Sequence, residues 1–577
     1  MLIVNFLYKP FQIKRIMKNL YLLLCLLPAL SAPGQAPVSE TIHVNSIEAK
    51  VWSNGAFFGY NNERSFKIPV SEEEDSVKVA VFRSVVPWMG GYDDFGNLKI
   101  ACASPTGITT DFLPGIMWHN EFNQIWRVTK EQIIGHIQDW QDNGIIDNPI
   151  PAIINWPGML MLHSYPSDTT FVNTKVAPFY DSNFNNVYEP LLGDFPHPDI
   201  LGVQGVIRIP DEMLFFAFHD YTDSTHPYSH SKKMGMQIFC TVWAYSCPED
   251  DFFNNSIFVN WECWNRMQDP IDSLHIGFLM NIELGNSNDN FIGSIPEQHI
   301  FYTYNGDSID ENGFEENTPL VSVFTFNAYA GTEPNIDIAM EYFMPINSGN
   351  NVPAGSGYPQ SPQGFYNYLT GHWSNGTPLR EGGNGFHPNE NLPAVRCVYP
   401  DNPTVTTGWS EPAAGNNPGQ RMALVSVPTS RMNPNTRTFR TFCYSWLRQN
   451  DALNPLSTAI DVIQQKSNYL SDLWTSWDSG LEYPDCFVAS SAPSVFQNEE
   501  EIKIWPNPST SILQVSSPDL IMKKIVLLDV SGKTCYEQSN ANNSQYILHL
   551  SLPPGLYFLT IDLENNTRIV RKIIITP

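Results

Sequence analysis

Residues 556–576 read LYFLTIDLENNTRIVRKIIIT, which is two apolar runs separated by the polar turn Glu564-Asn565-Asn566. Short runs that are rich in β-branched and aromatic residues and end at turn-forming residues predict β-strands. Four similar runs precede this pair, at 502–505, 512–515, 524–530 and 546–550. Six short strands at such close spacing predict a small antiparallel, immunoglobulin-like β-sandwich at this end of the chain.

The same strand-like alternation dominates the chain before this segment. Further β-type runs cover 41–51, 76–86, 238–244, 257–264 and 320–326, with a turn at 90–98. Two segments, 130–140 and 457–474, have helical spacing, and the second carries one apolar stripe typical of a core-facing helix. We therefore predict a mainly β fold, with a β-rich, sandwich-like body at 32–490, a linker at 491–500 and the small sandwich at 501–577.

Composition and charge favour an extracellular protein. Of the 577 residues, 16% are charged and 13% are aromatic, and 45 are proline. The formal net charge is −27, so nucleic acid is not expected as a partner, because phosphate binding needs a basic surface. The nine cysteines include no CxxC pair. Cys240 with Cys247 or Cys263 is the local candidate for a disulfide, and plain buried thiols are the alternative.

The first 31 residues have the features of a secretory signal peptide. Residues 17–31 read MKNLYLLLCLLPALS, in which a lysine precedes a short apolar run and the small residues Ala29 and Ser31 precede the expected cleavage point. Met17 is an alternative start. Neither this run nor any later one is long enough to cross a bilayer, so we expect the mature chain to lack a transmembrane segment.

Four segments near the C-terminus carry a family resemblance: Trp505-Pro506-Asn507-Pro508, 528–533, 554–559 and 571–575. In this order they resemble type A sorting domains of type IX secretion, with Trp505 in place of the usual tyrosine. The resemblance implies a set of sorting-motif residues, namely Pro506, Asn507, Pro508, Gly532, Gly555, Tyr557 and Lys572. An ordinary immunoglobulin-like binding module is the alternative.

The same resemblance implies partners and a location. The partners are the type IX translocon and its sortase. The chain would pass through the periplasm of a Bacteroidota-type cell and cross the outer membrane. It would then be secreted, or held on the outer cell surface, after removal of the domain. Short pieces of the body, such as Gly91-Tyr92-Asp93 and Tyr188-Glu189-Pro190, are also similar to large uncharacterised secreted Bacteroidota proteins, a likeness that implies no activity.

One loop of the body has the pattern of a calcium site. Asp181, Asn183 and Asn185 place oxygen-bearing side chains at positions 1, 3 and 5, and Ca²⁺ in proteins takes six to eight oxygen ligands. Val187 would add its carbonyl oxygen, and Asp194 would replace the glutamate that an EF-hand carries at position 12. The sequence therefore predicts Ca²⁺ as a ligand here, with a metal-free Asx-rich turn as the alternative.

Three more polar clusters have two interpretations each. The acidic clusters at 281–290 and 307–312 suit calcium or a simple turn. The third cluster consists of His219, Asp220, Asp223, His226 and His230. Its ligands suit a transition metal, but their spacing matches no known zinc pattern, so a polar loop is the preferred interpretation.

No complete catalytic motif is present in the sequence. There is no GxSxG, and Gly532-Lys533-Thr534 is not a P-loop, because Leu527 occupies the place of its first glycine. The preferred interpretation is an exported, non-enzymatic protein with a structural or adhesive body that calcium stabilises and that has a glycan or surface partner. The alternatives are a secreted hydrolase acting on polysaccharide or protein and a carbohydrate-binding module.

Overall fold

The computed structural model describes most of the chain between residues 36 and 575. The described ranges are 36–71, 77–163, 171–183, 185–198, 209–248, 250–316, 318–326, 341–347, 352–429, 431–448, 455–475, 503–507, 509–517, 521–529, 533–564 and 568–575. The predicted signal peptide and the predicted linker lie outside these residues. The body and the C-terminal domain are described separately.

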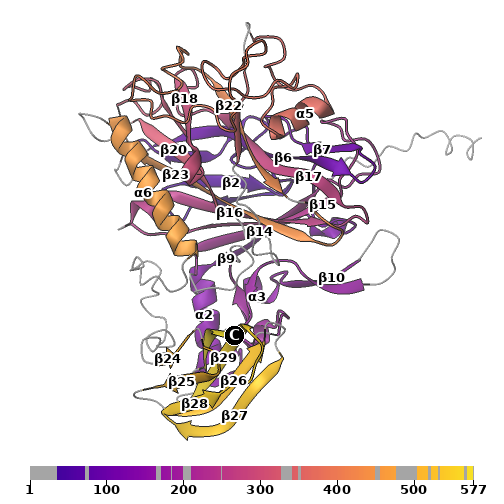
Figure 1. Ribbon diagram of the computed structural model, residues 1–577, viewed down its shortest axis with the longest axis vertical. Coiled ribbons are helices and arrows are strands. Elements are labelled where there is room, and N and C mark those ends of the chain that lie inside the picture. Colours follow the sequence, from indigo (N-terminus) through magenta and orange to yellow (C-terminus); the bar gives the residue numbers. More distant parts are fainter. Residues whose placement is uncertain are drawn as a thin grey trace, which may run out of the picture. The chain divides into compact units, whose positions relative to one another are not determined.

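The body contains two large antiparallel sheets (Figure 1). In spatial order the first consists of β1 (Ser39–Ile42), β2 (Glu48–Trp52), β5 (Phe66–Pro69), β6 (Lys78–Asp93), β17 (Ile271–Ile282), β22 (Arg421–Thr429) and β21 (Tyr342–Pro345), with β7 (Leu98–Cys102) beside β6. The second consists of β18 (Asn290–Ile295), β19 (Ile300–Asn305), β20 (Pro319–Phe326), β23 (Arg437–Arg448), β16 (Ser256–Asn265), β15 (Met236–Ala244), β14 (Glu212–His219) and β8 (Leu113–Pro114), with β9 (Trp126–Thr129) beside β14.

The two sheets pack face to face around one apolar core. Phe278 of β17 lies across the interface from Phe442 and Tyr444 of β23, with ring centroids 4.9 and 5.9 Å apart. Alternate residues on the strands of the second sheet join this core, and the residues between them point to the opposite face. Both faces of that sheet are therefore buried, which explains its nearly continuous apolar sequences.

A third layer covers the outer face of the second sheet. Its helices are α2 (Lys130–Asn143), α3 (Pro151–Ile154) and α6 (Pro455–Thr475). In α6, Ile460, Ile463 and Leu470 are buried in this layer, as their spacing predicts. Helix α2 begins at a capping box formed by Thr129 and Gln132 and ends at Gly144, whose φ of 76° is left-handed.

Smaller elements connect these layers. Three two-stranded ribbons pair β3 (Gly59–Tyr60) with β4 (Glu63–Arg64), β10 (Met159–His163) with β11 (Phe171–Lys175), and β12 (Phe179–Tyr180) with β13 (Phe195–Pro196). Two more α-helices are α4 (Asp251–Asn254) and α5 (Pro362–Leu369), and the 3₁₀ helices are η1 (Asn120–Phe122), η2 (Pro190–Leu192) and η3 (Pro296–Gln298).

The C-terminal domain is a small sandwich of a three-stranded and a four-stranded sheet. The first contains β24 (Lys503–Trp505), β25 (Ile512–Ser516) and β28 (Gln545–His549). The second contains β27 (Thr534–Asn543), β26 (Met522–Asp529), β29 (Gly555–Leu563) and β30 (Arg568–Ile575). Apolar residues of both sheets, such as Leu513, Leu527 and Ile573, form its core.

The predicted fold class, a mainly β protein with a small C-terminal sandwich, is confirmed. Three details differ. β27 was not predicted, because its sequence TCYEQSNANN lacks apolar alternation. The turn expected at 90–98 is shorter, since β6 continues to Asp93 and β7 begins at Leu98. The disulfide candidates were wrong for Cys240 and Cys263, which are free thiols on adjacent core strands, whereas Cys247 is disulfide-bonded.

Candidate functional site

Three of the four predicted sorting segments meet along β30. The Asn507 side chain accepts a hydrogen bond from the Ile574 amide at 2.9 Å, and the Ser509 amide donates to the Ile574 carbonyl at 2.9 Å. On the other side of β30, Gly555 and Tyr557 of β29 pair with Ile575 and Ile573. The Tyr557 hydroxyl donates to the Pro553 carbonyl at 2.9 Å. Three segments that are distant in sequence therefore form one structural unit.

Residues 503–576 match the family of secretion system C-terminal sorting domains. The chain is a type IX secretion cargo. The tail directs this cargo to the cell exterior, as a secreted or outer-surface protein. No curated protein matches the chain. Among the described residues, no helix has the length and apolar character needed to cross a bilayer.

The family match covers the domain as a whole, so the sorting roles of its individual motif residues stay predictions. Asn507, Gly555 and Tyr557 lie in the cluster around β30, and Pro506 precedes it. Pro508 and Gly532 lie outside the described residues, as does the side chain of Lys572, whose backbone pairs with Phe558.

The predicted calcium loop folds around its own oxygens. The Asn186 amide donates to Asp181 Oδ2 at 2.6 Å, and the Val187 amide donates to Asn185 Oδ1 at 2.7 Å. The Asn185 amide in turn donates to Asn183 Oδ1 at 3.1 Å. These are the bonds of consecutive Asx turns, and they are also compatible with a loop that presents oxygens to a cation.

Asp194 closes this loop and is fully buried. Its Oδ1 accepts from the Ser182 amide and hydroxyl at 2.9 and 2.7 Å, and its Oδ2 accepts from the Glu189 amide at 2.8 Å. Burial raises the pKa of this carboxyl. The described residues contain no group of three or more His, Cys, Asp or Glu side chains placed to hold a metal ion, so calcium at this loop would depend on amide and carbonyl oxygens.

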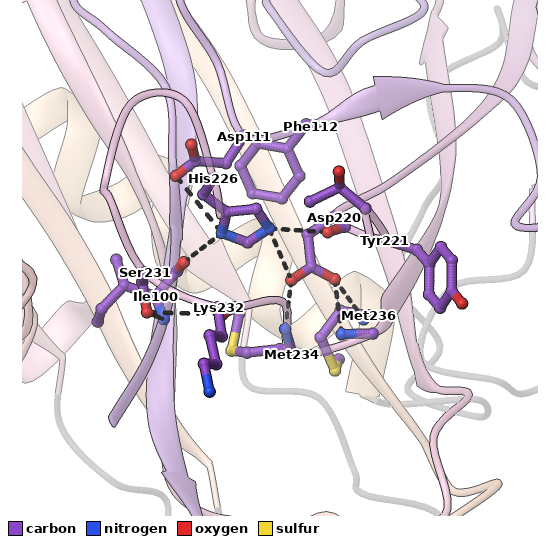
Figure 2. Close-up of polar contacts among 12 residues, drawn as sticks. Ile100, Asp111, Phe112, Asp220, Tyr221, His226, Ser231, Lys232, Met234 and Met236 are labelled. Atoms are coloured by element: carbon purple, nitrogen blue, oxygen red, sulfur yellow. Dashed lines mark hydrogen bonds and ion pairs between the residues drawn. The ribbon is translucent and has the colours of Figure 1, made fainter. Parts of the chain in front are cut away.

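The histidine cluster is a buried brace between the two sheets (Figure 2). His226 Nδ1 lies 2.7 Å from the Ile100 carbonyl oxygen, and His226 Nε2 lies 2.8 Å from the Asp220 carbonyl oxygen. Carbonyl oxygens only accept, so both bonds form when both ring nitrogens carry protons. The fully buried carboxylates of Asp111 and Asp220 flank the ring at 3.8 and 3.7 Å and supply the opposite charge.

Backbone amides complete this brace. Asp220 accepts from the amides of Met234, Gly235 and Met236 at 2.6, 2.8 and 2.6 Å. Asp111 accepts from the Cys102 amide of β7 at 2.9 Å. Asp220 and His226 lie on the predicted polar loop but are buried there, His219 is buried at the end of β14, and Asp223 and His230 are exposed. Each ring nitrogen of His226 thus faces a backbone carbonyl oxygen of the fold rather than an open position for a metal.

The sequence did not predict a second buried cluster, which surrounds Arg266. The guanidinium carbon of Arg266 lies 4.6 Å from the Trp118 ring centre and 4.4 Å from that of Trp264. One guanidinium nitrogen, Nη2, donates to the His163 carbonyl oxygen. The other two nitrogens, Nε and Nη1, and the indole nitrogens of both tryptophans have no hydrogen-bond acceptor among the described residues. We call Arg266, Trp118, Trp264 and His163 the Arg266 cluster.

The surroundings of Arg266 add positive charge and strain. The guanidinium carbon of Arg437 lies 4.4 Å from the centre of the Trp264 ring, and Lys233 Nζ lies 3.7 Å over the ring of Tyr221, which contacts Trp118. Burial, and then the charge of Arg437, lowers the pKa of Arg266 to about 10, so the guanidinium stays charged at neutral pH. Trp118 has a φ of 67°, a strained conformation for a bulky residue that is typical of functional sites.

Proposed function

We propose that the exported body is a non-enzymatic adhesive module that binds an anionic group at the Arg266 cluster and is stabilised by calcium. The observation that carries the proposal is Arg266, which is 1% exposed and keeps two nitrogens without acceptors in the described part of the chain. A buried charge is costly unless it is paired. All of the free hydrogen-bonding groups on the guanidinium and the two indoles are donors, so a matching ligand supplies acceptors and negative charge.

The chemistry of the cluster favours a carboxylate on a sugar. A guanidinium binds a carboxylate through two parallel hydrogen bonds, and the partly exposed indole ring of Trp118 can stack on the apolar face of a sugar ring. The rim of the cluster is open to solvent, because Trp118, His163 and Tyr221 are partly exposed and Phe171, beside His163, is 49% exposed. Export places this rim where extracellular polysaccharide is available. An acidic polysaccharide is therefore the partner that we propose.

Binding to immobilised polymers tests this function in the full chain. We expect binding to polygalacturonate and little binding to neutral galactan. The Arg266→Met variant should weaken binding to the acidic polymer at least tenfold, which corresponds to about 1.4 kcal/mol. Binding should also decrease as salt is added, since the rim is exposed to screening.

Arg431→Met is the matched control, because Arg431 is exposed and forms surface ion pairs with Asp94 and Asp272. It should bind polygalacturonate as the unmodified chain does. Trp118→Phe keeps a stacking ring without the indole N–H and should have an intermediate affinity. Equal binding to both polymers, or unchanged binding by a folded Arg266→Met variant, would contradict the proposal.

A further inference from the structure

The two remaining acidic segments of the sequence meet at one end of the β18–β19 hairpin. Asn290 of β18 pairs directly with Asn305 of β19, so their side chains emerge on the same face. One residue further out, the Gly306 amide donates to the Asp289 carbonyl at 2.5 Å. The main chains of Asp289, Asn290 and Asn305 are therefore adjacent at the point where the 283–289 and 306–315 loops leave the sheet. We call these three residues the Asp289 cluster.

Asp310 ties the two loops together. Its Oδ1 accepts from the Asn286 amide at 2.7 Å, and its Oδ2 accepts from the Phe314 amide at 2.6 Å. The carboxylate lies between Gly285 and Gly313, and a Cβ atom on either glycine would clash with it. Asp310 is thus occupied by structural bonds, and it fixes the loop that carries Asp289 against the loop that follows Asn305.

The Asp289 cluster, by contrast, has oxygens that nothing satisfies. Both carboxylate oxygens of Asp289 and the side-chain oxygens of Asn290 and Asn305 have no donor within the described part of the chain. Asp289 is 8% exposed, and the two asparagines are more buried still. The amide nitrogens are already committed, since Asn290 Nδ2 donates to the Asn286 carbonyl at 3.1 Å and Asn305 Nδ2 donates to the Asp307 carbonyl at 3.3 Å.

The local charge makes this arrangement costly without a ligand. Burial, followed by the charges of Asp310, Asp307 and Glu311, raises the pKa of Asp289 to about 7. Among the described residues, no Lys, Arg or His forms an ion pair with Asp289. Arg421, the first residue of β22, is paired with Glu411 at 2.8 Å. A buried carboxylate with no donor and acidic neighbours is stabilised by a cation or by a proton.

We propose that the Asp289 carboxylate and the side-chain oxygens of Asn290 and Asn305 bind one Ca²⁺ ion, with water and loop carbonyls completing its coordination. The free atoms are all oxygens, which suit a hard cation, and no sulfur or imidazole is present to favour a transition metal. Two of the three side chains are neutral amides, which Ca²⁺ accepts as ligands. This site gives a place to the calcium of the proposed function, and it does not depend on anion binding at the Arg266 cluster.

The structure also separates this site from the rest of the 281–290 segment. Glu283 pairs with Arg64 at 2.8 Å, and Asn281 Nδ2 donates to the Pro105 carbonyl at 3.2 Å. These two residues lie at the end of β17 in the first sheet, and we do not propose them as ligands.

Calcium titration of the full chain tests the site. After treatment with chelator, added Ca²⁺ should raise the melting temperature, with half of the effect at a concentration of about 10⁻⁴–10⁻³ M, the range of extracellular calcium modules. The isosteric Asp289→Asn variant should lose at least a tenfold factor in calcium affinity. Asn305→Asp, which adds a second carboxylate, should bind calcium more tightly than the unmodified chain.

Asp223→Asn is the control, because Asp223 is an exposed carboxylate outside the cluster, and it should titrate as the unmodified chain does. Two results would overturn the proposal. One is a chain whose melting does not respond to millimolar Ca²⁺. The other is a folded Asp289→Asn variant whose calcium titration is unchanged.

Discussion

The Arg266 cluster and the Asp289 cluster are opposite in sign and alike in construction. In the first, a buried guanidinium and two indoles have free donors; in the second, a buried carboxylate and two amides have free acceptors. The Asp111–His226–Asp220 brace contains charges just as deeply buried, yet its histidine ring and its carboxylates all contact protein groups of the chain. Burial of charge alone therefore does not mark a ligand site. The two proposed sites differ from the brace because polar groups around each buried charge are unmatched among the described residues.

The largest effect should come from breaking the completed brace. Asp220→Ala removes the acceptor of three backbone amides and one of the two charges beside His226, and it should cost about 3–5 kcal/mol of unfolding free energy. Denaturant unfolding measures this loss, with Asp223→Ala as a control that should change stability by less than about 0.5 kcal/mol. Neither Ca²⁺ nor galacturonate should restore the loss; recovery with either ligand would contradict the distinction between the brace and the two clusters.

The next largest effect should be a gain in the free energy of unfolding. Arg266→Met removes a buried charge that has no acidic partner among the described residues and keeps a long apolar side chain, so it should stabilise the protein by about 1–3 kcal/mol in buffer without polyanions. The same denaturant titration measures the gain, and adding galacturonate should reduce the difference from the unmodified chain. A loss of stability in both conditions would mean that the guanidinium is already satisfied within the fold.

The dependence of stability on acidic pH should test the surroundings of Arg266, because the charge of Arg266 affects the pKa of His219. Burial, and then the charge of Arg266, lowers the pKa of His219 to about 3. Below about pH 6.5 the unfolded chain binds a proton that folded His219 refuses, so stability is present above pH 6.5 and is lost as the pH falls toward 3. The contribution is about 1.4 kcal/mol per pH unit.

The variant His219→Asn isolates this contribution, since an amide oxygen still accepts the Tyr221 amide that now donates to His219 Nδ1 at 3.1 Å. Unfolding at pH 7 and pH 5.5 should show a smaller acid loss in the variant, by about 1.4 kcal/mol. A remaining acid slope is expected from His275, because burial lowers its pKa to about 4. Identical slopes in both proteins would show that His219 takes up its proton without unfolding.

Sequence patterns predicted the fold class because alternation and turn residues act locally. They predicted the strand around 257–264 and the apolar stripe of α6, which depend on short-range spacing. The pairing of Asn290 with Asn305 depends on the register of a hairpin, and so the segments 281–290 and 307–312 looked like separate loops. No local sequence signal indicates that Arg266, which directly follows the buried strand β16, lacks an acidic partner among the described residues. Whether an acid lies near it depends on the tertiary fold.

The smallest expected effect concerns the loop of Asp181, Asn183, Asn185, Val187 and Asp194. It resembles the Asp289 cluster in composition, but each of its Asp and Asn side chains accepts at least one hydrogen bond from an amide of the loop. If it also binds calcium, the Asp289→Asn variant should keep a weak calcium-dependent rise in melting temperature. Adding Asn185→Ala should then remove that rise, at a cost of about 0.5–1 kcal/mol, since one ligand oxygen and one hydrogen bond are lost. Calorimetry of the two variants with chelator and with Ca²⁺ measures it. If the Asp289→Asn variant alone no longer responds to calcium, the Asp181 loop is an Asx-rich turn. Its backbone amides then neutralise the side-chain oxygens that a cation would otherwise bind.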